Sequence, residues 1–466
     1  MLKALLIAGV IYVSALMLFS LRSRKKEADS KLYLLAGSNL GAFLGFFTFA
    51  ATLFSTFTIL GMPDFFRDHG VGAWVFLAVS DGVMVFGIMV IGLFLRRKAL
   101  DNNFLGMSGL LERCYGNRSA GIIAFIGAFL FLIPYVAIQI RGVAIFLNQA
   151  FPDVLPLWVW ALAMMGVMII YSEIGGLKAI IYSDMLQGII LLLVIWIIAI
   201  SCIRMVGGMD TMMAQVEAVN PALLSVPGPK GLFKFQFLIS SMIAIALLPY
   251  TQPQVSSRLV IMRDHRAMFR MAVGVGFFAI LVILPTAFIG FYGAIKYSGV
   301  PTSEFLGKAL ITDQAPVIAA LALIGLIAAA ISTADSQIFS LGGELRSLLK
   351  GEDKKMLNIT RVAIGCFAAM ALGFSLIAND QLVLLARTSF AGTSLMAPMI
   401  FTGLFAPEGK ANKALPWITL AAIVYFVASL VHLVPDFWGG LRVDLGLLIL
   451  LTFTAIGMRL AGKSAN

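Results

Sequence analysis

The chain has 466 residues, of which 60% are hydrophobic and only 12% are charged, and its mean hydropathy is +0.98. This composition is typical of a membrane protein with many spans and excludes a large soluble enzyme. The three cysteines and three histidines are too scattered to suggest a disulfide framework or a local metal motif. No nucleophile and base stand together in the sequence, so we expect neither an enzyme nor an organic cofactor.

The net charge of +11 is explained by membrane topology better than by a nucleic-acid partner. The first apolar segment, residues 2–21, is followed by the basic residues Arg22, Arg24, Lys25 and Lys26. That order is the reverse of a signal peptide and predicts a retained helix whose N-terminus lies outside the cell. We therefore expect a multi-pass protein of the plasma (cell inner) membrane, surrounded by lipid, with a cytoplasmic C-terminus and no nucleic-acid partner.

Apolar runs of membrane-spanning length recur along nearly the whole chain. They predict about thirteen transmembrane helices, over residues 2–21, 41–65, 74–95, 119–148, 157–174, 180–206, 234–252, 269–295, 314–345, 357–378, 382–405, 414–433 and 441–459. The second to eleventh spans form two sets of five, and an odd number of spans forces the second set to run in the opposite sense. The prediction is a single membrane domain, residues 1–466, with an extra N-terminal helix (2–21), a first repeat (41–206), a second repeat (234–405) and two extra C-terminal helices (414–459).

The stretch Leu40–Pro63, LGAFLGFFTFAATLFSTFTILGMP, is long enough to cross a bilayer, but small and hydroxyl residues fill its middle. A helix that unwinds at membrane depth exposes carbonyl groups, which are tolerated only where they line a cavity or meet an ion. The stretch is therefore either a broken helix at a binding site or a face for close helix packing. A second interruption is expected at LLPYTQPQ, where Pro249 and Pro253 each remove an amide donor. Two interrupted helices at matching places indicate a site near the middle of the membrane.

The richest polar segment at membrane depth is AAAISTADSQIF, in which Ser332, Asp335 and Ser336 share one face of a helix. A carboxylate beside hydroxyls suits a hard cation, whereas hydroxyls alone are often satisfied by the carbonyls of their own helix. In YSEIGGLKAIIYSDMLQG, residues 171–188, a Gly-Gly turn precedes a helix that contains Asp184. Asp184 is either a functional carboxylate or a helix cap.

Four segments together resemble the sodium:solute symporter family, which includes carriers of proline, pantothenate, sialic acid and glucose. GGLKAIIYSDMLQG resembles the family's Gly-Gly…Thr-Asp-x-(Ile/Leu)-Gln signature, with Ser183 in place of Thr, and AAAISTADSQ resembles its Ala-x-x-Ser-Thr/Ser sodium motif. QPQVSSR resembles the Gln-Pro-(His)-x-x-x-Arg motif of the proline carriers, with Gln254 in place of His. SGLLERCYGNR resembles a cytoplasmic Glu-(Tyr/Leu)-Leu-Glu-x-Arg-Tyr-Gly segment, with Cys114 in place of Arg. The order and spacing of these segments extend the resemblance from the first helix to about residue 406.

The resemblance implies an all-α, LeuT-like fold of two inverted five-helix repeats with broken first helices, and a sodium ion at the family's second site. Carried over by motif, the ligands of that ion are the carbonyls of Ala51, Phe54 and Ala329 and the hydroxyls of Ser332 and Thr333. Leu53 stands where many relatives have Asp or Asn. That departure removes a polar group near the expected sodium site.

Some relatives, the sialic acid carriers among them, hold a second sodium nearer the cytoplasm. The matching residues here are Ser55, Asp184, Asp335 and Ser336. Because Asp335 stands where those relatives have Ser, this site would have an extra carboxylate. The extra carboxylate could bind a second sodium, carry a proton or pair with a cation from the protein itself.

We expect the substrate to lie beside the broken helix, near residues Ser55, Thr56, Thr58, Phe76, Ser80, Asp81, Gln139, Arg141 and Gln252. Arg141 presents a planar guanidinium suited to a carboxylate, in a sequence context similar to that of the acid-binding arginine of sialic acid carriers. The alternatives are an ion pair between Arg141 and Asp81, or an Arg141 side chain that extends to the outer surface. These residues do not choose between a sugar acid, a monocarboxylate and an amino acid.

The sequence thus predicts a sodium-coupled secondary active symporter that imports a small organic anion or amino acid by alternating access, with one or two sodium ions. A proton-coupled carrier of the same fold, using Asp184 and Asp335, is the main alternative. A transporter-like sensor is a weaker one, because the C-terminal RLAGKSAN leaves no room for an output domain.

Overall fold

The computed structural model describes residues 1–23, 29–231, 235–377 and 382–464, which are helical almost throughout. Arg24, Lys25 and Lys26 of the predicted first cytoplasmic segment lie outside these ranges. So do Lys234, the first residue of the predicted second repeat, and Ala378, the last residue of the predicted tenth span.

Nine of the described helical segments are long and apolar enough to cross a membrane, or up to eleven if each of two bent helix pairs is one span. The nine are built from α1 (Leu2–Ser23), α5 (Gly72–Trp74) with η2 (Val75–Val79) and α6 (Ser80–Asp101), α8 (Arg118–Ala150), α9 (Leu157–Met205), α13 (His265–Lys296), α15 (Pro316–Leu348), α16 (Asp353–Ile377), α17 (Leu382–Ser394) with α18 (Ala397–Phe405), and α20 (Val443–Ser464). A further apolar helix, α19 (Leu415–Leu430), has 16 residues. The predicted number of about thirteen spans therefore stays a prediction.

Both predicted interruptions are present as bent helix pairs. The first pair is α3 (Ala42–Leu53) followed by η1 (Phe57–Gly61) and α4 (Met62–His69), bent by 57°. The second pair is α11 (Phe235–Thr251) and α12 (Pro253–Val260), bent by 56°. Pro253 has no N–H and drives the residue before it into an extended conformation, which Gln252 adopts with φ −104° and ψ 117°.

One half of the first broken helix, α3, is joined to one half of the second, α12, by backbone hydrogen bonds at their ends. The N–H of Leu40, just before α3, donates to the carbonyl of Ile261, just after α12, at 3.0 Å. The N–H of Arg263 returns to the carbonyl of Leu40 at 2.8 Å. Close packing extends this contact, because a Cβ at Gly45 would lie 2.5 Å from the sulfur of Met262. We refer to α3 and α12 as the inner halves of the two broken helices.

The predicted Gly-Gly turn lies within the 49-residue helix α9 as a kink at Gly176, whose φ is 61° and ψ is −161°. A side chain is excluded there, since a Cβ would lie 2.9 Å from the carbonyl oxygen of Tyr33. Asp184 follows eight residues later, inside the helix and not at its start. The interpretation of Asp184 as a helix cap is therefore wrong.

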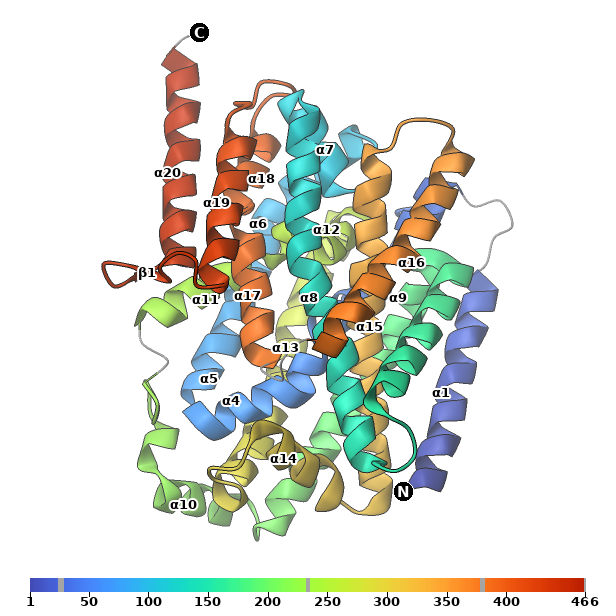
Figure 1. The fold of residues 1–466 in the computed structure, drawn as a ribbon, viewed down its shortest axis with the longest axis vertical. Coiled ribbons are helices and arrows are strands. Elements are labelled where there is room, and N and C mark those ends of the chain that lie inside the picture. The colour runs from blue at the N-terminus through green and yellow to red at the C-terminus, as the bar shows by residue number, and fades with distance from the viewer. Residues whose placement is uncertain (24–28, 232–234, 378–381, 465–466) are drawn as a thin grey trace.

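Helix α15 lies inside the bundle and packs against α8, α9, α16 and α3 (Figure 1). Its middle is made of the small residues Ala328, Ala329 and Ala330, all of which are buried. Small side chains let helices approach closely inside a membrane. This packing brings the hydroxyl-rich part of α15 to the broken helix α3.

Short elements connect the long helices. They are α2 (Ser30–Leu35), α7 (Met107–Tyr115), α10 (Met209–Val219), η3 (Pro221–Leu224), α14 (Thr302–Gly307), η4 (Lys308–Thr312), and the hairpin of β1 (Phe437–Trp438) with β2 (Leu441–Arg442).

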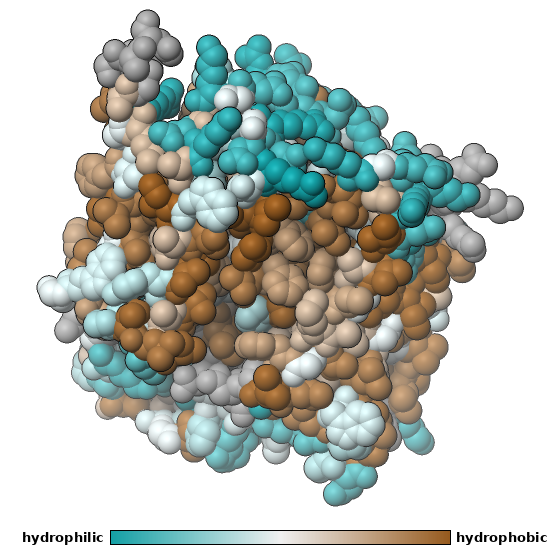
Figure 2. Space-filling view, turned by 45° about the horizontal axis from the view of Figure 1, so that its top comes forward, coloured by the Kyte–Doolittle hydropathy of each residue, from teal (hydrophilic) through white to brown (hydrophobic). Residues whose placement is uncertain are grey.

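The chain begins and ends at opposite ends of the molecule, since α1 starts at the end where α10 and α14 lie and α20 finishes at the other (Figure 1). Hydrophilic side chains gather at the end where α20 finishes, and hydrophobic side chains form a belt below them (Figure 2). This arrangement is that of a protein surrounded by lipid around its middle.

Helix α13 lies so close to α4 that the position of Gly290 leaves no space for a Cβ, which would be 2.5 Å from the carbonyl oxygen of Pro63. We expect Gly290→Ala to destabilise the protein by about 1–3 kcal/mol through overpacking. The matched control is Gly166→Ala on α9, where a Cβ meets no atom within 4 Å and alanine should stabilise the helix by about 0.5–1 kcal/mol. Thermal unfolding in detergent measures both, and a similar shift in the two variants would contradict the close approach.

Candidate functional site

The break in the first broken helix leaves three backbone N–H groups bonded to side chains instead of to carbonyls of their own helix. The N–H of Ser55 donates to the hydroxyl of Thr58 at 3.1 Å, and that of Thr56 donates to Oε1 of Gln139 at 3.0 Å. The N–H of Phe57 donates to the hydroxyl of Ser55 at 3.1 Å. In a continuous helix these groups would bond to the carbonyls four residues earlier. Those carbonyls are therefore released from the helix.

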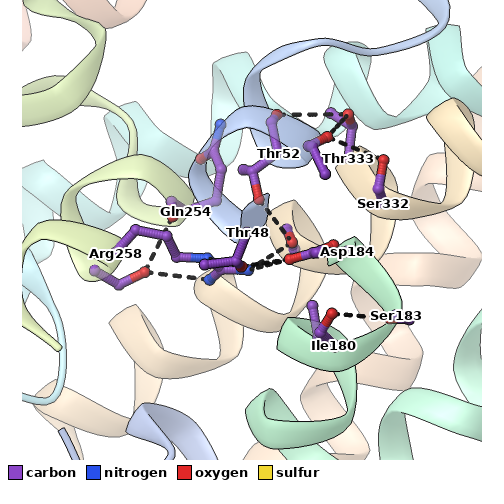
Figure 3. Close-up of polar contacts among 12 residues, drawn as sticks. Thr48, Thr52, Ile180, Ser183, Asp184, Gln254, Arg258, Ser332 and Thr333 are labelled. Atoms are coloured by element: carbon purple, nitrogen blue, oxygen red, sulfur yellow. Dashed lines mark hydrogen bonds and ion pairs between the residues drawn. The ribbon is translucent and has the colours of Figure 1, made fainter. Parts of the chain in front are cut away.

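The released carbonyls meet two hydroxyls of α15 (Figure 3). The Ser332 hydroxyl lies 2.9 Å from the carbonyl oxygen of Ala51 and 3.0 Å from that of Ala329. The Thr333 hydroxyl lies 3.4 Å from the Ala51 oxygen and 3.5 Å from that of Thr52. All five residues are buried. The structure thus brings together an enclosed cluster of neutral oxygen atoms from two helices, which is the donor set that a hard cation prefers.

Four of the five predicted sodium ligands take part in these contacts. The alternative interpretation, in which hydroxyls bond to carbonyls of their own helix, also finds support, because the Ser332 hydroxyl donates to the carbonyl of Ala329. The fifth, Phe54, is the residue at the break, with φ −90° and ψ 111°. Its carbonyl is released too, because the N–H of Thr58 bonds to the carbonyl of Ser55 at 2.8 Å. The carbonyl of Thr52 was not predicted, although its place next to Ala51 at the break could have indicated it.

A second polar network lies beside the cluster and is centred on Arg258 of α12, whose side chain is completely buried (Figure 3). Its Nη2 lies 3.5 Å from Oδ2 of Asp184 and 2.7 Å from the hydroxyl of Ser336. Its Nε lies 3.1 Å from the hydroxyl of Thr48, which in turn donates to Asp184. The Thr52 hydroxyl reaches Ser336 at 3.2 Å. Arg258 and Thr48 were missed as site residues, although Arg258 is the last residue of the QPQVSSR motif.

The four residues of the predicted second cation site are not gathered at one point. Asp184 and Ser336 share Arg258, while the Ser55 hydroxyl accepts the N–H of Phe57 at the break. Asp335 is 2% exposed, and neither of its carboxylate oxygens has a hydrogen-bond partner among the described residues. The cation from the protein therefore pairs with Asp184 and not with Asp335.

Some of the predicted substrate residues do surround the two breaks. Thr56, Thr58 and Gln139 meet at the first break, and within the described part of the chain the buried Thr56 hydroxyl has no hydrogen-bond partner. Gln252 lies at the second break, where its Oε1 accepts from Nε2 of Gln254 at 2.6 Å. Nε2 of Gln252 is likewise buried without a partner in the described residues. These are uncharged donors and acceptors placed at the breaks.

The predicted residues before and within α6 are arranged differently. The Ser80 hydroxyl donates to the carbonyl of Phe76 in its own chain segment, and the Phe76 ring contacts Phe65 and Phe237. Asp81 is 6% exposed. Asp81 is thus buried in the bundle.

Arg141 lies two residues after Gln139 on α8, which turns its side chain about 200° around the helix from the side that reaches the break. Its Nη1 donates to the carbonyl of Ser375 at the end of α16, at 2.7 Å. The structure does not form the alternative ion pair between Arg141 and Asp81. Recognition of a carboxylate by Arg141 stays a prediction.

The model of the sodium:solute symporter family matches residues 33–340, about two thirds of the chain. The chain belongs to this family. Members of the family are membrane transporters and not enzymes, which confirms the class expected from composition and motifs.

Several curated transporters are similar to this chain over most of its length. The sodium/pantothenate symporter of Haemophilus influenzae is 24% identical over 435 residues, covering 91% of this chain and 85% of the relative. The osmoregulated proline transporter OpuE of Bacillus subtilis is 23% identical, covering 90% of this chain and 86% of the relative.

Among solved structures, a substrate-bound, outward-open Na+-coupled sialic acid symporter is similar with a TM-score of 0.78 at 16% identity, covering 97% of each chain. A nucleobase-cation-symport-1 transporter, Mhp1, is similar with a TM-score of 0.55 at 12% identity, covering 93% of this chain and 95% of the other. At these identities the likeness concerns the fold. The expected LeuT-like, all-helical fold with broken helices is confirmed.

The bond from Ser55 N–H to Thr58 gives a direct test of how the break is held. We expect Thr58→Val, which keeps the shape and removes the acceptor, to destabilise the protein by about 1–3 kcal/mol, because a buried N–H is left unsatisfied. Thr454→Val on α20 is the control, since that hydroxyl donates to Leu450 of its own helix and its loss should cost little. Equal melting temperatures of the two variants in detergent would show that the Thr58 bond does not support the break.

Proposed function

We propose that this protein is a sodium-coupled secondary active symporter that imports a small organic solute by alternating access. The observation that carries the proposal is the contact between released carbonyls of the first broken helix and the hydroxyls of Ser332 and Thr333 on α15. Family membership supports sodium-coupled transport of a small solute.

Sodium would be held by the carbonyl oxygens of Ala51, Phe54 and Ala329 and by the hydroxyl oxygens of Ser332 and Thr333. Hydroxyls that now donate to carbonyls can turn their hydrogens away and present lone pairs to a cation. Once bound, the ion itself satisfies the released carbonyls, so they need no hydrogen bond from water or from another protein group. The donors are uncharged and enclosed, so the positive charge of the ion would be stabilised by carbonyl dipoles.

Coupling follows from the position of these ligands on two different helices. An ion bound between α3 and α15 would stabilise the arrangement in which the break has its present shape. The same break positions Thr56 and Gln139, at which we place the substrate together with Ser55, Thr58 and Gln252. Sodium and substrate would therefore tighten each other's binding by the same factor.

For the substrate we propose a carboxylate-bearing solute, namely a sugar acid, a monocarboxylate or an amino acid. The relatives and the similar structure are named for pantothenate, proline and sialic acid, each of which bears a carboxylate. Arg141 would have to exchange its bond to Ser375 for the substrate, as a planar guanidinium can do. Asp81, enclosed near the start of α6, would face a positively charged part of an amino acid.

A proton-coupled carrier of the same fold is the second candidate, and Asp335 is the observation that favours it. A buried carboxylate without a hydrogen-bond partner is costly as an anion. Either a proton or a cation would remove that cost. In both cases Asp335 would take up the proton or cation from one side of the membrane and release it on the other side.

We further propose that the protein lies in the cell inner membrane with its N-terminus outside and its C-terminus in the cytoplasm. The basic residues that follow the first apolar segment support this orientation, because basic segments remain on the cytoplasmic side.

We expect sodium, but not potassium, to raise the melting temperature of the purified protein, since a ligand at 100 times its Kd adds about 2.7 kcal/mol to stability. Ser332→Ala with Thr333→Val should abolish this effect. Thr419→Val is the control, because its buried hydroxyl bonds to Leu415 of its own helix. If sodium has no effect while acid pH and substrate stabilise together, the carrier is coupled to protons.

A panel of organic anions and amino acids tests the substrate. We expect the matching compound to stabilise the protein further only when sodium is present, and its uncharged amide or ester to do so weakly. Arg141→Gln should remove the preference for the acid over its amide while leaving sodium stabilisation unchanged. A preference that survives in Arg141→Gln would place the carboxylate elsewhere.

A further inference from the structure

The feature that the proposed transport cycle leaves unused is the buried guanidinium of Arg258. Its side chain is 0% exposed, as is that of its ion-pair partner Asp184. Arginine keeps its charge at any physiological pH, and burying a charge is costly unless it is paired and hydrogen-bonded. Here the charge is paired with Asp184 and bonded to the hydroxyls of Thr48 and Ser336.

These partners coincide with ligands that the sequence assigned to a second sodium ion. Of that set, Asp184 and Ser336 are both bonded to Arg258, at 3.5 Å and 2.7 Å. Oδ2 of Asp184 also accepts the hydroxyl of Thr48, and the Ser336 hydroxyl is also bonded to Thr52. Oδ2 of Asp184 and the Ser336 hydroxyl are therefore already engaged by a positive charge that the chain itself supplies, while Oδ1 of Asp184 has no hydrogen-bond partner among the described residues.

From this geometry we infer that Arg258 is the resident cation of the Asp184 site, so that no sodium ion binds at Asp184 and Ser336 during the cycle. The inference rests on the proposed sodium-coupled function and deepens it, because it specifies how many ions can be coupled. A sodium ion bound to Asp184 as well would put two positive charges on the same buried carboxylate. Loss of the guanidinium would leave an unpaired carboxylate and two hydroxyls, which is a donor set for an alkali cation.

Asp335 does not alter this assignment. It is bonded neither to Arg258 nor to any other described residue through its carboxylate oxygens. Asp335→Asn and Asp184→Asn, made separately, distinguish a cation that Asp335 takes from one that is held by Asp184.

The test measures binding of radioactive sodium to the purified full-length protein by equilibrium dialysis. The background is Ser332→Ala with Thr333→Val, in which the first sodium site is removed. We expect Arg258→Met in this background to gain about one sodium ion per protein, and Arg258→Met with Asp184→Asn to lose it again. Arg258→Lys is the matched control, because it keeps a positive charge at the same position and should gain none.

Two results would overturn the assignment. One is an Arg258→Met protein that is folded, as judged by thermal unfolding, but gains no sodium. The other needs no change at Arg258: sodium bound to the Ser332→Ala/Thr333→Val protein with native Arg258 and lost on Asp184→Asn would mean that the ion and the guanidinium share the site. A native protein that binds no sodium would instead refute the proposed sodium coupling. Even then, sodium binding gained by Arg258→Met would identify Arg258 as the resident cation.

Discussion

The structure depends on the first helix break, where backbone groups inside the membrane must find hydrogen-bond partners other than those of a regular helix. At the first break, the N–H groups of Ser55, Thr56 and Phe57 find side-chain acceptors. The carbonyls that they leave behind have no water to turn to inside a bilayer. Hydroxyls of α15 lie at these carbonyls. The N–H groups of the break are thus satisfied by two side chains of the same segment and by Gln139 of α8. The carbonyls of Ala51 and Thr52 are met by hydroxyls of α15.

This division explains why α15 is made as it is. Its alanines bring the backbone close to α3, and its hydroxyls then reach the released carbonyls. Bulky aliphatic residues at the same positions would separate the helices and leave the carbonyls without partners. Packing and ion chemistry are therefore parts of one arrangement, in which the same contacts that close the bundle also create a cluster of oxygen atoms.

Much of this could be predicted from the sequence, because hydropathy, proline and hydroxyl patterns act locally. The bend at Gln252 follows from Pro253, and the contact of Ser332 with Ala51 follows from matched motifs. Arg258 could not be placed, because its partners lie on three other helices and no spacing along the chain brings them together. Arg141 shows the converse, since a favourable local context did not reveal that the side chain turns toward Ser375.

The joined inner halves of the two broken helices carry a consequence for how the molecule moves. Helices α3 and α12 are attached at their ends by the backbone bonds of Leu40, and deeper in the membrane by the bond from Arg258 to Thr48. Two attachment points separated along the helix axes prevent one half from pivoting without the other. We therefore expect α3 and α12 to move as one rigid unit, so that a change of angle at one break is accompanied by a change at the other.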